Sequence, residues 1–340
     1  MSLVRVGTSG WSYPTGKGTW NGVFYPVASE RTRVSHANGA GHGAPASERV
    51  GGSGGAKPPG SRFDELAFYA EHFDTVEVNS SFYGVPTPQT TKRWAERTPP
   101  NFEFALKLYQ KFTHPEMFAK ATGEDAMDLG RKDVDEFRRA LDPLAGSGKL
   151  GPLLAQFPPS FKNEPDSRGY LEWLLKAFED YAVAVELRHR SFSDEPEGTF
   201  RLLGEFGAAW VQIDEPKFRF SIRQNLLPNV RTFYYMRLHG RNAAQWWKHD
   251  TSEDRYNYLY SAQELSPIVE AAETASRAVK KSYVYTNNHF SAKSVANAAQ
   301  IRKQLGQELP GEYPEAFVER YPDLRGLVRI LKTRPSDRLV

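Results

Sequence analysis

Eight short runs rich in β-branched and aromatic residues alternate along this chain with amphipathic stretches, and this order is the strongest constraint on its fold. Such alternation is typical of parallel βαβ units joined by right-handed crossovers. Eight units predict an α/β protein with a single (β/α)₈ TIM-type barrel. The alternative is an open doubly wound sheet, but no Gly-x-Gly-x-x-Gly motif follows a strand. The expected strands cover residues 3–7, 75–79, 102–107, 151–156, 182–188, 209–214, 233–239 and 282–286.

Apolar residues recur at helical spacing between most of these runs. Helices are also expected over residues 265–279 and 291–305. The crossover 215–231 shows no clear helical pattern and is the weakest of the eight units. The residues expected on the buried helix faces are Phe63, Leu66, Ala67, Ala70 and Phe73, then Val134, Phe137, Leu141 and Leu144, then Leu171, Leu174, Leu175 and Phe178.

Composition divides the chain unevenly. Residues 1–306 are expected to form the barrel, and residues 307–340 a C-terminal helical extension packed on it. The segment 27–62 is rich in Gly, Ala, Ser and Pro and contains scattered Arg and Lys, so it cannot bury enough apolar area to fold alone. It follows the first strand and is therefore expected at the carboxyl face of the barrel. We interpret it as a solvated insertion, with a basic lid over that face as the alternative.

Charge and cysteine content narrow the function. The chain has no cysteine, which excludes disulfides, thiolate metal sites and a cysteine nucleophile. Its 44 Lys and Arg against 41 Asp and Glu give a formal net charge of +3, too small by itself to imply nucleic-acid binding. No apolar run approaches the ~20 residues of a membrane span, and the first residues lack the apolar core of a secretory signal. We therefore expect a cytoplasmic protein without membrane contact; the sequence does not indicate its oligomeric state.

The alternation of side chains along the strands predicts which residues face the barrel lumen. In the run 75–79, Val76 and Val78 are the apolar, helix-facing pair, so Glu77 points inward. The same argument on the other strands places four acids and four bases inside. Because an unpaired buried charge costs several kcal/mol, each must pair with another residue, with water or with a ligand. These residues are Glu77, Glu103, Glu186 and Asp214, and Arg5, Lys107, Arg188 and Arg237.

Most of these charges stand at the carboxyl ends of their strands, where barrel enzymes place their chemistry. Arg5 and Glu103 lie nearer the amino end and are expected to form a structural pair. The competing interpretation of the whole set is an ion-pair network that only fills the barrel.

A series of motifs in fixed order also resembles a known family. They are GTSGWSY (7–13), WNGVFYP (20–26), YAEHFDTVEVNSSFY (69–83), FEFALK (102–107), LGPLLAQFPP (150–159), VELRH (185–189), RLHG (237–240) and YTNNH (285–289). Together they are similar to the YecE-like family, a domain of unknown function numbered 72, over almost the whole chain to about residue 305. The resemblance implies a (β/α)₈ barrel and a site, but no established reaction. The chain departs from the family pattern in its long segment 27–62 and in Thr286, where an aromatic residue is common.

The strand-end residues suggest an enzyme of hydrolase or isomerase type acting on a small polar, anionic ligand such as a sugar phosphate, a nucleotide or a nucleic-acid end. Glu77 or Asp214 is the expected general base and His239 its acid–base partner, while cationic side chains bind the anion. Aromatic residues in the same loops can stack on the ligand. The candidate catalytic residues are Glu77, Glu186, Asp214 and His239; the candidate ligand-binding residues are Trp11, Tyr13, Asn79, Tyr83, Lys107, Gln156, Arg188, His189, Arg237, Asn287 and Asn288.

Three alternatives remain open at this point. Glu77 and Glu186 could act as the carboxylate pair of a glycosidase, facing each other across the lumen. No cofactor is evident, although the acids with His239 and His189 could hold a divalent metal, as in a metal-dependent barrel hydrolase. A non-catalytic module could instead bind nucleic acid through the basic segment 27–62 and the aromatic loops.

Overall fold

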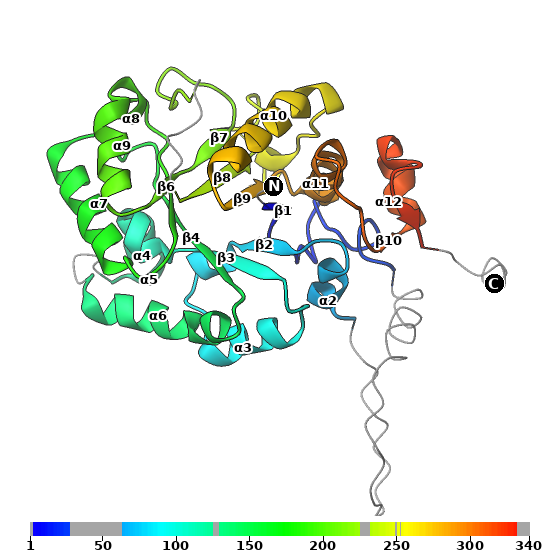
Figure 1. Ribbon diagram of the computed structural model, residues 1–340, viewed down its shortest axis with the longest axis horizontal. Helices are drawn as coiled ribbons and strands as arrows, with labels where there is room; N and C mark the ends of the chain where they lie inside the picture. The colour runs from blue at the N-terminus through cyan, green and yellow to red at the C-terminus, as the bar shows by residue number, and fades with distance from the viewer. Residues whose placement is uncertain are drawn as a thin grey trace, which may run out of the picture.

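Nine parallel strands form a nearly closed barrel with the helices packed around its outside (Figure 1). The computed structural model describes residues 3–27, 63–124, 129–224, 232–248, 250–251 and 253–331. The strand order is β6-β5-β4-β3-β2-β1-β9-β8-β7, and every neighbouring pair in this sheet is parallel. The predicted TIM-type barrel is therefore confirmed, and the open doubly wound sheet is not formed.

The strands agree closely with the β-rich runs. They are β1 (Leu3–Ser9), β2 (Thr75–Val78), β3 (Glu103–Lys107), β4 (Leu150–Gln156), β5 (Val183–Glu186), β6 (Ala209–Trp210), β7 (Gln212–Asp214), β8 (Phe233–Leu238) and β9 (Lys281–Thr286).

The longer helices occupy the crossovers between strands, except that α11 follows the last barrel strand. They are α2 (Glu65–Ala70), α3 (Pro88–Glu96), α5 (Pro115–Thr122), α6 (Arg131–Gly146), α7 (Pro165–Ala177), α9 (Pro196–Glu205), α10 (Ala262–Ala278) and α11 (Lys293–Gln304). Shorter turns of helix are α4 (Gln110–Thr113), α8 (Ser191–Asp194), η1 (Ser80–Phe82), η3 (Asp254–Tyr256) and η4 (Phe290–Ala292). In the described part of the crossover 215–231, residues 215–224, there is no helix, as expected.

The barrel closes through the run 209–214, which is divided into two strands, β6 and β7. β6 pairs with β5 and β7 pairs with β8, with only Val211 between them. The backbone N–H of Val211 still donates to the carbonyl of Val185 at 2.9 Å. The side-chain amide of Gln224 takes the place of a neighbouring strand, because Nε2 donates to the carbonyl of Val211 at 2.7 Å and Oε1 accepts from the N–H of Ile213 at 2.9 Å. The alternation of side chains continues across the break: Trp210 is in register with Val185 and Gln212 with Met236, on the helix side, whereas Ile213 is in register with Arg237.

The predicted buried faces of α6 and α7 are confirmed: Val134, Phe137, Leu141 and Leu144 are buried, as are Leu171, Leu174, Leu175 and Phe178. The face predicted for the first helix was partly wrong. Leu66 and Phe73 are buried, but Phe63, Ala67 and Ala70 are only half-buried. The helix α2 is short, and Phe68 and Tyr69 turn inward instead. Tyr69 does so because its hydroxyl donates to the carbonyl of Thr75 at 3.0 Å, beneath β2.

The C-terminal segment packs beside the residues that follow β1. It contains β10 (Glu312–Tyr313), α12 (Glu315–Arg320), η5 (Pro322–Leu324) and β11 (Arg329–Ile330). The ring centroids of Tyr313 and Phe317 lie 6.2 and 5.7 Å from that of Phe24. Apart from Val27, the segment 27–62 lies outside the described residues, so its interpretation as an insertion or lid stays a prediction.

A close strand contact makes Gly7 sensitive to substitution. A Cβ added there would lie 2.3 Å from the carbonyl oxygen of Thr75, which belongs to the backbone of β2 and cannot turn away. We expect Gly7→Ala to lower the free energy of unfolding by about 1–3 kcal/mol through overpacking. In Gly169→Ala, by contrast, the added Cβ has no heavy atom within 4 Å, and α7 should gain up to about 1 kcal/mol. Urea denaturation of the two variants checks this; equal effects would contradict the contact.

Candidate functional site

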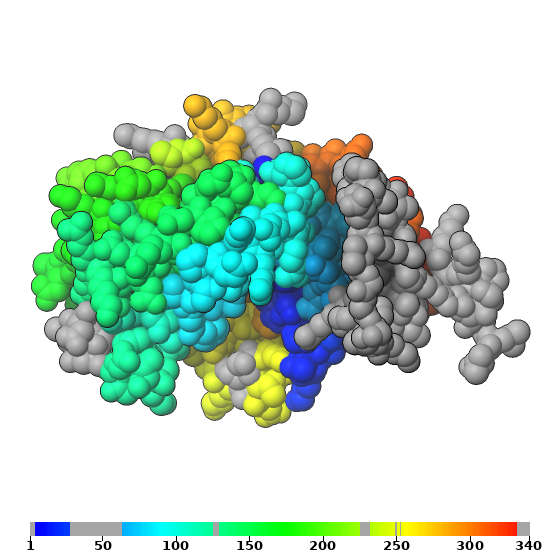
Figure 2. All heavy atoms as spheres, turned by 90° about the horizontal axis from the view of Figure 1, so that it is seen from below, coloured from blue at the N-terminus to red at the C-terminus, as the bar shows by residue number. Residues whose placement is uncertain are grey.

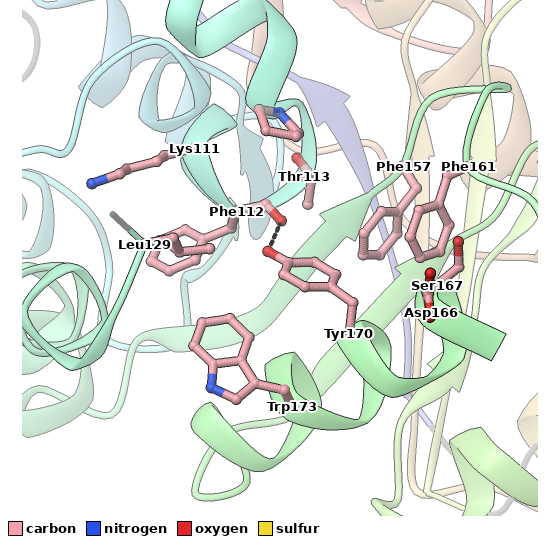
Figure 3. Close-up of a pocket in the computed structure, with 11 residues that line it drawn as sticks. Lys111, Phe112, Thr113, Leu129, Phe157, Phe161, Asp166, Ser167, Tyr170 and Trp173 are labelled. Carbon is pink, nitrogen blue, oxygen red and sulfur yellow. Dashed lines mark hydrogen bonds between the residues drawn. The ribbon is translucent and has the colours of Figure 1, made fainter. Parts of the chain in front are cut away.

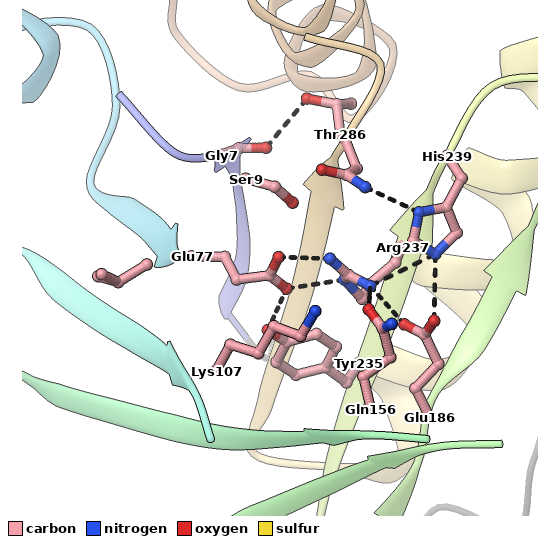
Figure 4. Close-up of polar contacts among 12 residues, drawn as sticks. Gly7, Ser9, Glu77, Lys107, Gln156, Glu186, Tyr235, Arg237, His239 and Thr286 are labelled. Carbon is pink, nitrogen blue, oxygen red and sulfur yellow. Dashed lines mark hydrogen bonds and ion pairs between the residues drawn. The ribbon is translucent and has the colours of Figure 1, made fainter. Parts of the chain in front are cut away.

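The guanidinium of Arg237 stands at the centre of the polar cluster inside the barrel (Figure 4). Its Nε and Nη2 donate to the two carboxylate oxygens of Glu77 at 2.9 and 2.7 Å. Its Nη1 donates to Glu186 at 2.5 Å and to the side-chain oxygen of Gln156 at 3.0 Å. The hydroxyl of Tyr235 donates to Glu77 at 2.7 Å. One arginine therefore binds two of the four carboxylates that the sequence predicted inside the lumen, Glu77 through Nε and Nη2 and Glu186 through Nη1.

A second arginine holds the outer side of Glu186. Both Nε and Nη2 of Arg188 lie 2.7 Å from Oε1 of Glu186. The ring of His239 completes this group, with its Nε2 3.3 Å from Glu186 and 3.2 Å from Arg188. The amide nitrogen of Asn287 lies 2.9 Å from the other ring nitrogen of His239. Of the two arginines, Arg188 is the more accessible, with 13% of its side chain exposed against 1% for Arg237.

Burial and these charges determine the protonation of the cluster. Burial opposes the ionisation of Glu186, but the charges of Arg237 and Arg188 outweigh it and hold the pKa of this carboxyl well below its usual range. For His239, burial lowers the pKa to about 3; Glu186 opposes the shift, and the two arginines add to it. At neutral pH the cluster therefore contains an ionised Glu186 beside a neutral imidazole.

Lys107 ends β3 on the same side of the lumen, and in Figure 4 its amine points toward the cluster without a dashed line to any residue drawn. Its Nζ lies 3.9 Å from the ring centroid of Phe82. Within the described part of the chain, no carboxylate lies within ion-pair distance of this nitrogen. Burial lowers the pKa of Lys107 to about 7, and the charge of Arg237 is the next largest cause. This amine is therefore partly neutral at physiological pH.

Two polar atoms near Lys107 are buried without a hydrogen-bond partner among the described residues. They are the hydroxyl of Ser9, at the end of β1, and the side-chain oxygen of Asn79, which follows β2. Because β1, β2 and β3 are neighbours in the sheet, Ser9, Asn79 and Lys107 stand at three adjacent strand ends. Buried polar atoms are normally satisfied, so this group marks a place for a polar ligand or water.

Three of the predicted aromatic residues lie in the loops around this cluster. Trp11 packs edge-on against Trp94, with ring centroids 5.4 Å apart. Tyr13 donates a hydrogen bond to the carbonyl of Ser9 and stacks on His289 at 4.2 Å. Tyr83, by contrast, is 73% exposed.

Three predicted site residues lie apart from the cluster. The carboxylate of Asp214 accepts from Nε and Nη2 of Arg241 at 2.9 and 2.7 Å and from the hydroxyl of Tyr260 at 2.7 Å. Its expected position facing the lumen cluster was wrong: Asp214 is in register with Leu238 on the helix side, and Ile213, in register with Arg237, takes the lumen side instead. His189 bonds to Ser191 through Nδ1, and the amide of Asn288 donates to the carbonyl of Tyr258 and to Asn297.

Sequence reasoning missed three further residues of the cluster. Tyr235 has the same parity as Arg237 on β8, so the alternation could have found it. Glu215 directly follows Asp214, and its carboxylate lies 3.6 Å from Arg188. Burial raises the pKa of Glu215 although Arg188 opposes the shift. His114 contacts the edge of the Phe82 ring at 5.0 Å; burial and then the charge of Lys107 lower its pKa to about 4.

The lower network is separate and matches its prediction. Arg5 lies 3.2 Å from Glu103 and 2.7 Å from Asp74, and Glu103 also accepts from Lys281 at 2.7 Å. The structural pair of Arg5 and Glu103 at the amino end of the barrel is therefore confirmed.

Two tyrosines on β8 allow a matched test of the cluster. Tyr235 donates to the carboxylate of Glu77, whereas Tyr234 donates to the neutral side chain of Gln212 at 2.6 Å. Hydrogen bonds to charged groups contribute about 1.5–3 kcal/mol and neutral ones about 0.5–1.5 kcal/mol. We expect Tyr235→Phe to lower the free energy of unfolding more than Tyr234→Phe does, as measured by urea denaturation. The reverse order would mean that Arg237 alone satisfies Glu77.

The loops after β1 and β8 meet over this end of the barrel. The carboxylate of Glu253 accepts from the N–H of Gly18 at 2.8 Å. Figure 2 shows the corresponding yellow and blue segments side by side on the surface.

A separate hollow of about 530 Å³ lies beside the barrel mouth (Figure 3). It is mostly apolar, and Phe157, Phe161, Tyr170 and Trp173 form much of its wall. None of the predicted site residues lines it.

The donor set gives little support to a metal centre. Among the described residues, no three His, Asp or Glu side chains gather closely enough to hold an ion. Glu77 and Glu186 are instead bound to arginines. In the same part of the chain, no helix has the length and apolar character needed to cross a membrane.

Comparison with known proteins agrees with this architecture. Residues 56–317 match the family model described as protein of unknown function DUF72. The chain is 30% identical to UPF0759 protein YunF of Bacillus subtilis over 257 residues, covering 74% of this chain and 89% of the relative. It is 32% identical to UPF0759 protein YecE of Escherichia coli over 154 residues, covering 44% of this chain and 52% of the relative.

Two solved structures are similar as well. The DUF72 family protein of Thermotoga maritima is 32% identical with a TM-score of 0.67, covering 90% of this chain and 100% of the other. The DUF72 family protein of Enterococcus faecalis is 23% identical with a TM-score of 0.69, covering 91% and 99%. The chain with its barrel and its family motifs therefore belongs to the YecE-like DUF72 family, a family of unknown function.

Proposed function

We propose that the carboxyl end of the barrel is the active site of an enzyme, of hydrolase or isomerase type, that takes a small polar ligand with an anionic group. The observation that carries the proposal is the amine of Lys107, which points into the lumen beside two arginine-bound carboxylates and has no anionic partner of its own among the described residues. An anion entering the barrel mouth would supply that partner.

The charge distribution supports an anion rather than a cation. Glu77 and Glu186 are neutralised by Arg237 and Arg188, so neither carboxylate is free to attract a positive ligand. Arg188 is the more exposed of the two arginines, with 13% of its side chain exposed against 1% for Arg237. Planar guanidinium groups bind phosphates and carboxylates well.

The protonation states support acid–base chemistry. A group with a pKa near the working pH can both take up and release a proton efficiently, and Lys107, with a pKa of about 7, meets this condition. We assign the general base to Lys107 rather than to Glu77, because Glu77 accepts three hydrogen bonds from Arg237 and Tyr235. In this proposal Glu77 and Glu186 position Arg237. The neutral imidazole of His239, beside Glu186, is available as a second acid–base group.

Proton uptake provides the test. Because an anion next to Lys107 raises the pKa of its amine, binding at pH 8 should take up a fraction of a proton. Calorimetric titration with ribose 5-phosphate and inorganic phosphate, in two buffers of different ionisation enthalpy, measures that uptake. Free ribose is the neutral comparison.

Matched lysine variants distinguish binding at Lys107 from a general electrostatic attraction between the protein and anions. Lys111 already pairs with Asp133 at 2.7 Å, so Lys111→Met should bind the anions as the wild type does. Lys107→Met should bind them at least about tenfold more weakly, the loss of one charge-assisted contact of about 1.4 kcal/mol or more. Equal binding by both variants, or binding without proton uptake, would refute the proposed site.

The nucleic-acid alternative stays a prediction, because the basic segment 27–62 lies outside the described residues except for Val27. A gel shift at rising salt, with and without that segment, tests it directly.

A further inference from the structure

We infer that Lys107 is a nucleophile that forms a Schiff base with an aldehyde or ketone carrying an anionic group, an inference that rests on the proposed function and narrows its substrate class. The argument starts from the position of this amine at the mouth of the barrel and from the groups that surround it.

The surroundings of Lys107 keep the amine available for bond formation. The other buried or partly buried lysines in the described chain are occupied: Lys111 bonds to Asp133, Lys149 donates to the carbonyls of Ala95 and Thr98 at 2.6 Å, and Lys293 donates to the side-chain oxygen of Asn257. Lys107 instead has the aromatic face of Phe82 on one side, 3.9 Å from its Nζ. The carboxylates that could hold an ammonium, Glu77 and Glu186, are bound to Arg237.

The charges nearby favour the nucleophilic form of the amine. The ring of Phe82 attracts an ammonium, but burial and the charge of Arg237 oppose protonation and lower the pKa of Lys107 to about 7. Burial or a neighbouring cation is the usual way in which a lysine is activated for attack on a carbonyl. Both conditions are present here.

Unused hydrogen-bonding atoms stand at the ends of β2 and β1, the next two strands of the sheet after that of Lys107. The hydroxyl of Ser9 and the side-chain oxygen of Asn79, at these two strand ends, are buried without partners among the described residues. They suit the hydroxyl groups of a small sugar-like carbonyl compound. Arg188, with 13% of its side chain exposed, is the cation that we assign to its phosphate or carboxylate.

The covalent step balances without a further reagent. The lone pair of Nζ adds to the carbonyl carbon, and both amine protons leave with the carbonyl oxygen as one water molecule. The imine then takes up one proton from solvent. The resulting cation withdraws electrons from the adjacent carbon, so that a C–H or C–C bond there can break with its electron pair delocalised onto the nitrogen. Proton transfer at that carbon is an isomerase-type reaction.

Borohydride trapping tests the inference. The full-length protein is incubated with dihydroxyacetone phosphate or pyruvate, reduced with sodium borohydride and mapped by peptide mass spectrometry. At pH 7.5 we expect one reduced adduct on Lys107, at least about tenfold above any exposed lysine, because ordinary lysines are almost fully protonated at that pH. Labelling should rise with pH around a midpoint near 7.

The controls separate reactivity from folding and from simple anion binding. Lys107→Arg retains the charge and should remove the adduct without unfolding the protein, as circular dichroism verifies, whereas Lys111→Met should be labelled as the wild type is. Adducts spread evenly over surface lysines would overturn the Schiff base. If phosphate binding still depends on Lys107 in that case, the proposed function survives; if phosphate binding is also unaffected by Lys107→Met, both fail.

Discussion

Replacing Arg237 by methionine is expected to lower the free energy of unfolding by about 3–5 kcal/mol, the cost of leaving buried charges without their partner. Arg237 is 1% exposed and binds Glu77 through two nitrogens and Glu186 through the third. Methionine has a similar length but no donor, so Glu77 would keep only Tyr235. Without the charge of Arg237 the pKa of Glu186 should rise, and the loss of stability should be largest above pH 6.

The measurement is urea denaturation of the variant at pH 7.5 and pH 5. Arg97→Met is the matched control, because Arg97 forms an ion pair with Asp64 in which both side chains are more than a third exposed. Such exposed pairs contribute about 0–1 kcal/mol. If Arg237→Met is as mild as Arg97→Met, the carboxylates of the cluster are not held as described.

The second large effect concerns the pH dependence of stability at Lys107. Its amine has a pKa of about 7 in the folded protein and about 10.4 in an unfolded chain. Between these values the unfolded state binds more protons, so this group makes the folded protein more stable as the pH rises. Below pH 7 the folded protein must hold a buried ammonium. Lys107→Met removes that cost and should raise the melting temperature at pH 6 clearly more than at pH 9.

Thermal unfolding of wild type and variant at the two pH values gives this difference directly. Lys111→Met serves again as the comparison, because Lys111 is an ion-paired lysine and its loss should not stabilise the protein at either pH. A melting-temperature difference for Lys107→Met that is identical at pH 6 and pH 9 would contradict the lowered pKa.

Period-two alternation predicted much of the cluster from sequence alone. Val76 and Val78 are buried, and Glu77 between them does face the lumen; the same holds for Glu186, Arg237 and His239. The argument works on these strands because residues alternate strictly between the two sides and the apolar ones take the helix side.

The prediction failed for the run 209–214, where Val211 and Ile213 were assigned to the helix side. Ile213 is instead in register with Arg237 and faces the lumen, so Asp214 turns outward to Arg241 and Glu215 reaches Arg188. Parallel strands are buried on both sides, so apolar side chains alone do not show which side of such a strand faces the lumen. The sequence also could not predict that the amine of Lys107 has no carboxylate partner among the described residues. This depends on how Arg237 distributes its hydrogen bonds among three other strands.

The way in which Arg237 uses its donors also limits how this cluster can change during evolution. Three nitrogens of one planar group serve Glu77, Glu186 and Gln156, which stand on β2, β5 and β4. A lysine at this position has one nitrogen and cannot reach all three, so no single substitution of the arginine leaves the others satisfied. Positions 77, 156, 186 and 237 should therefore be inherited as a set, and a relative that has lost the arginine should have replaced both acids as well.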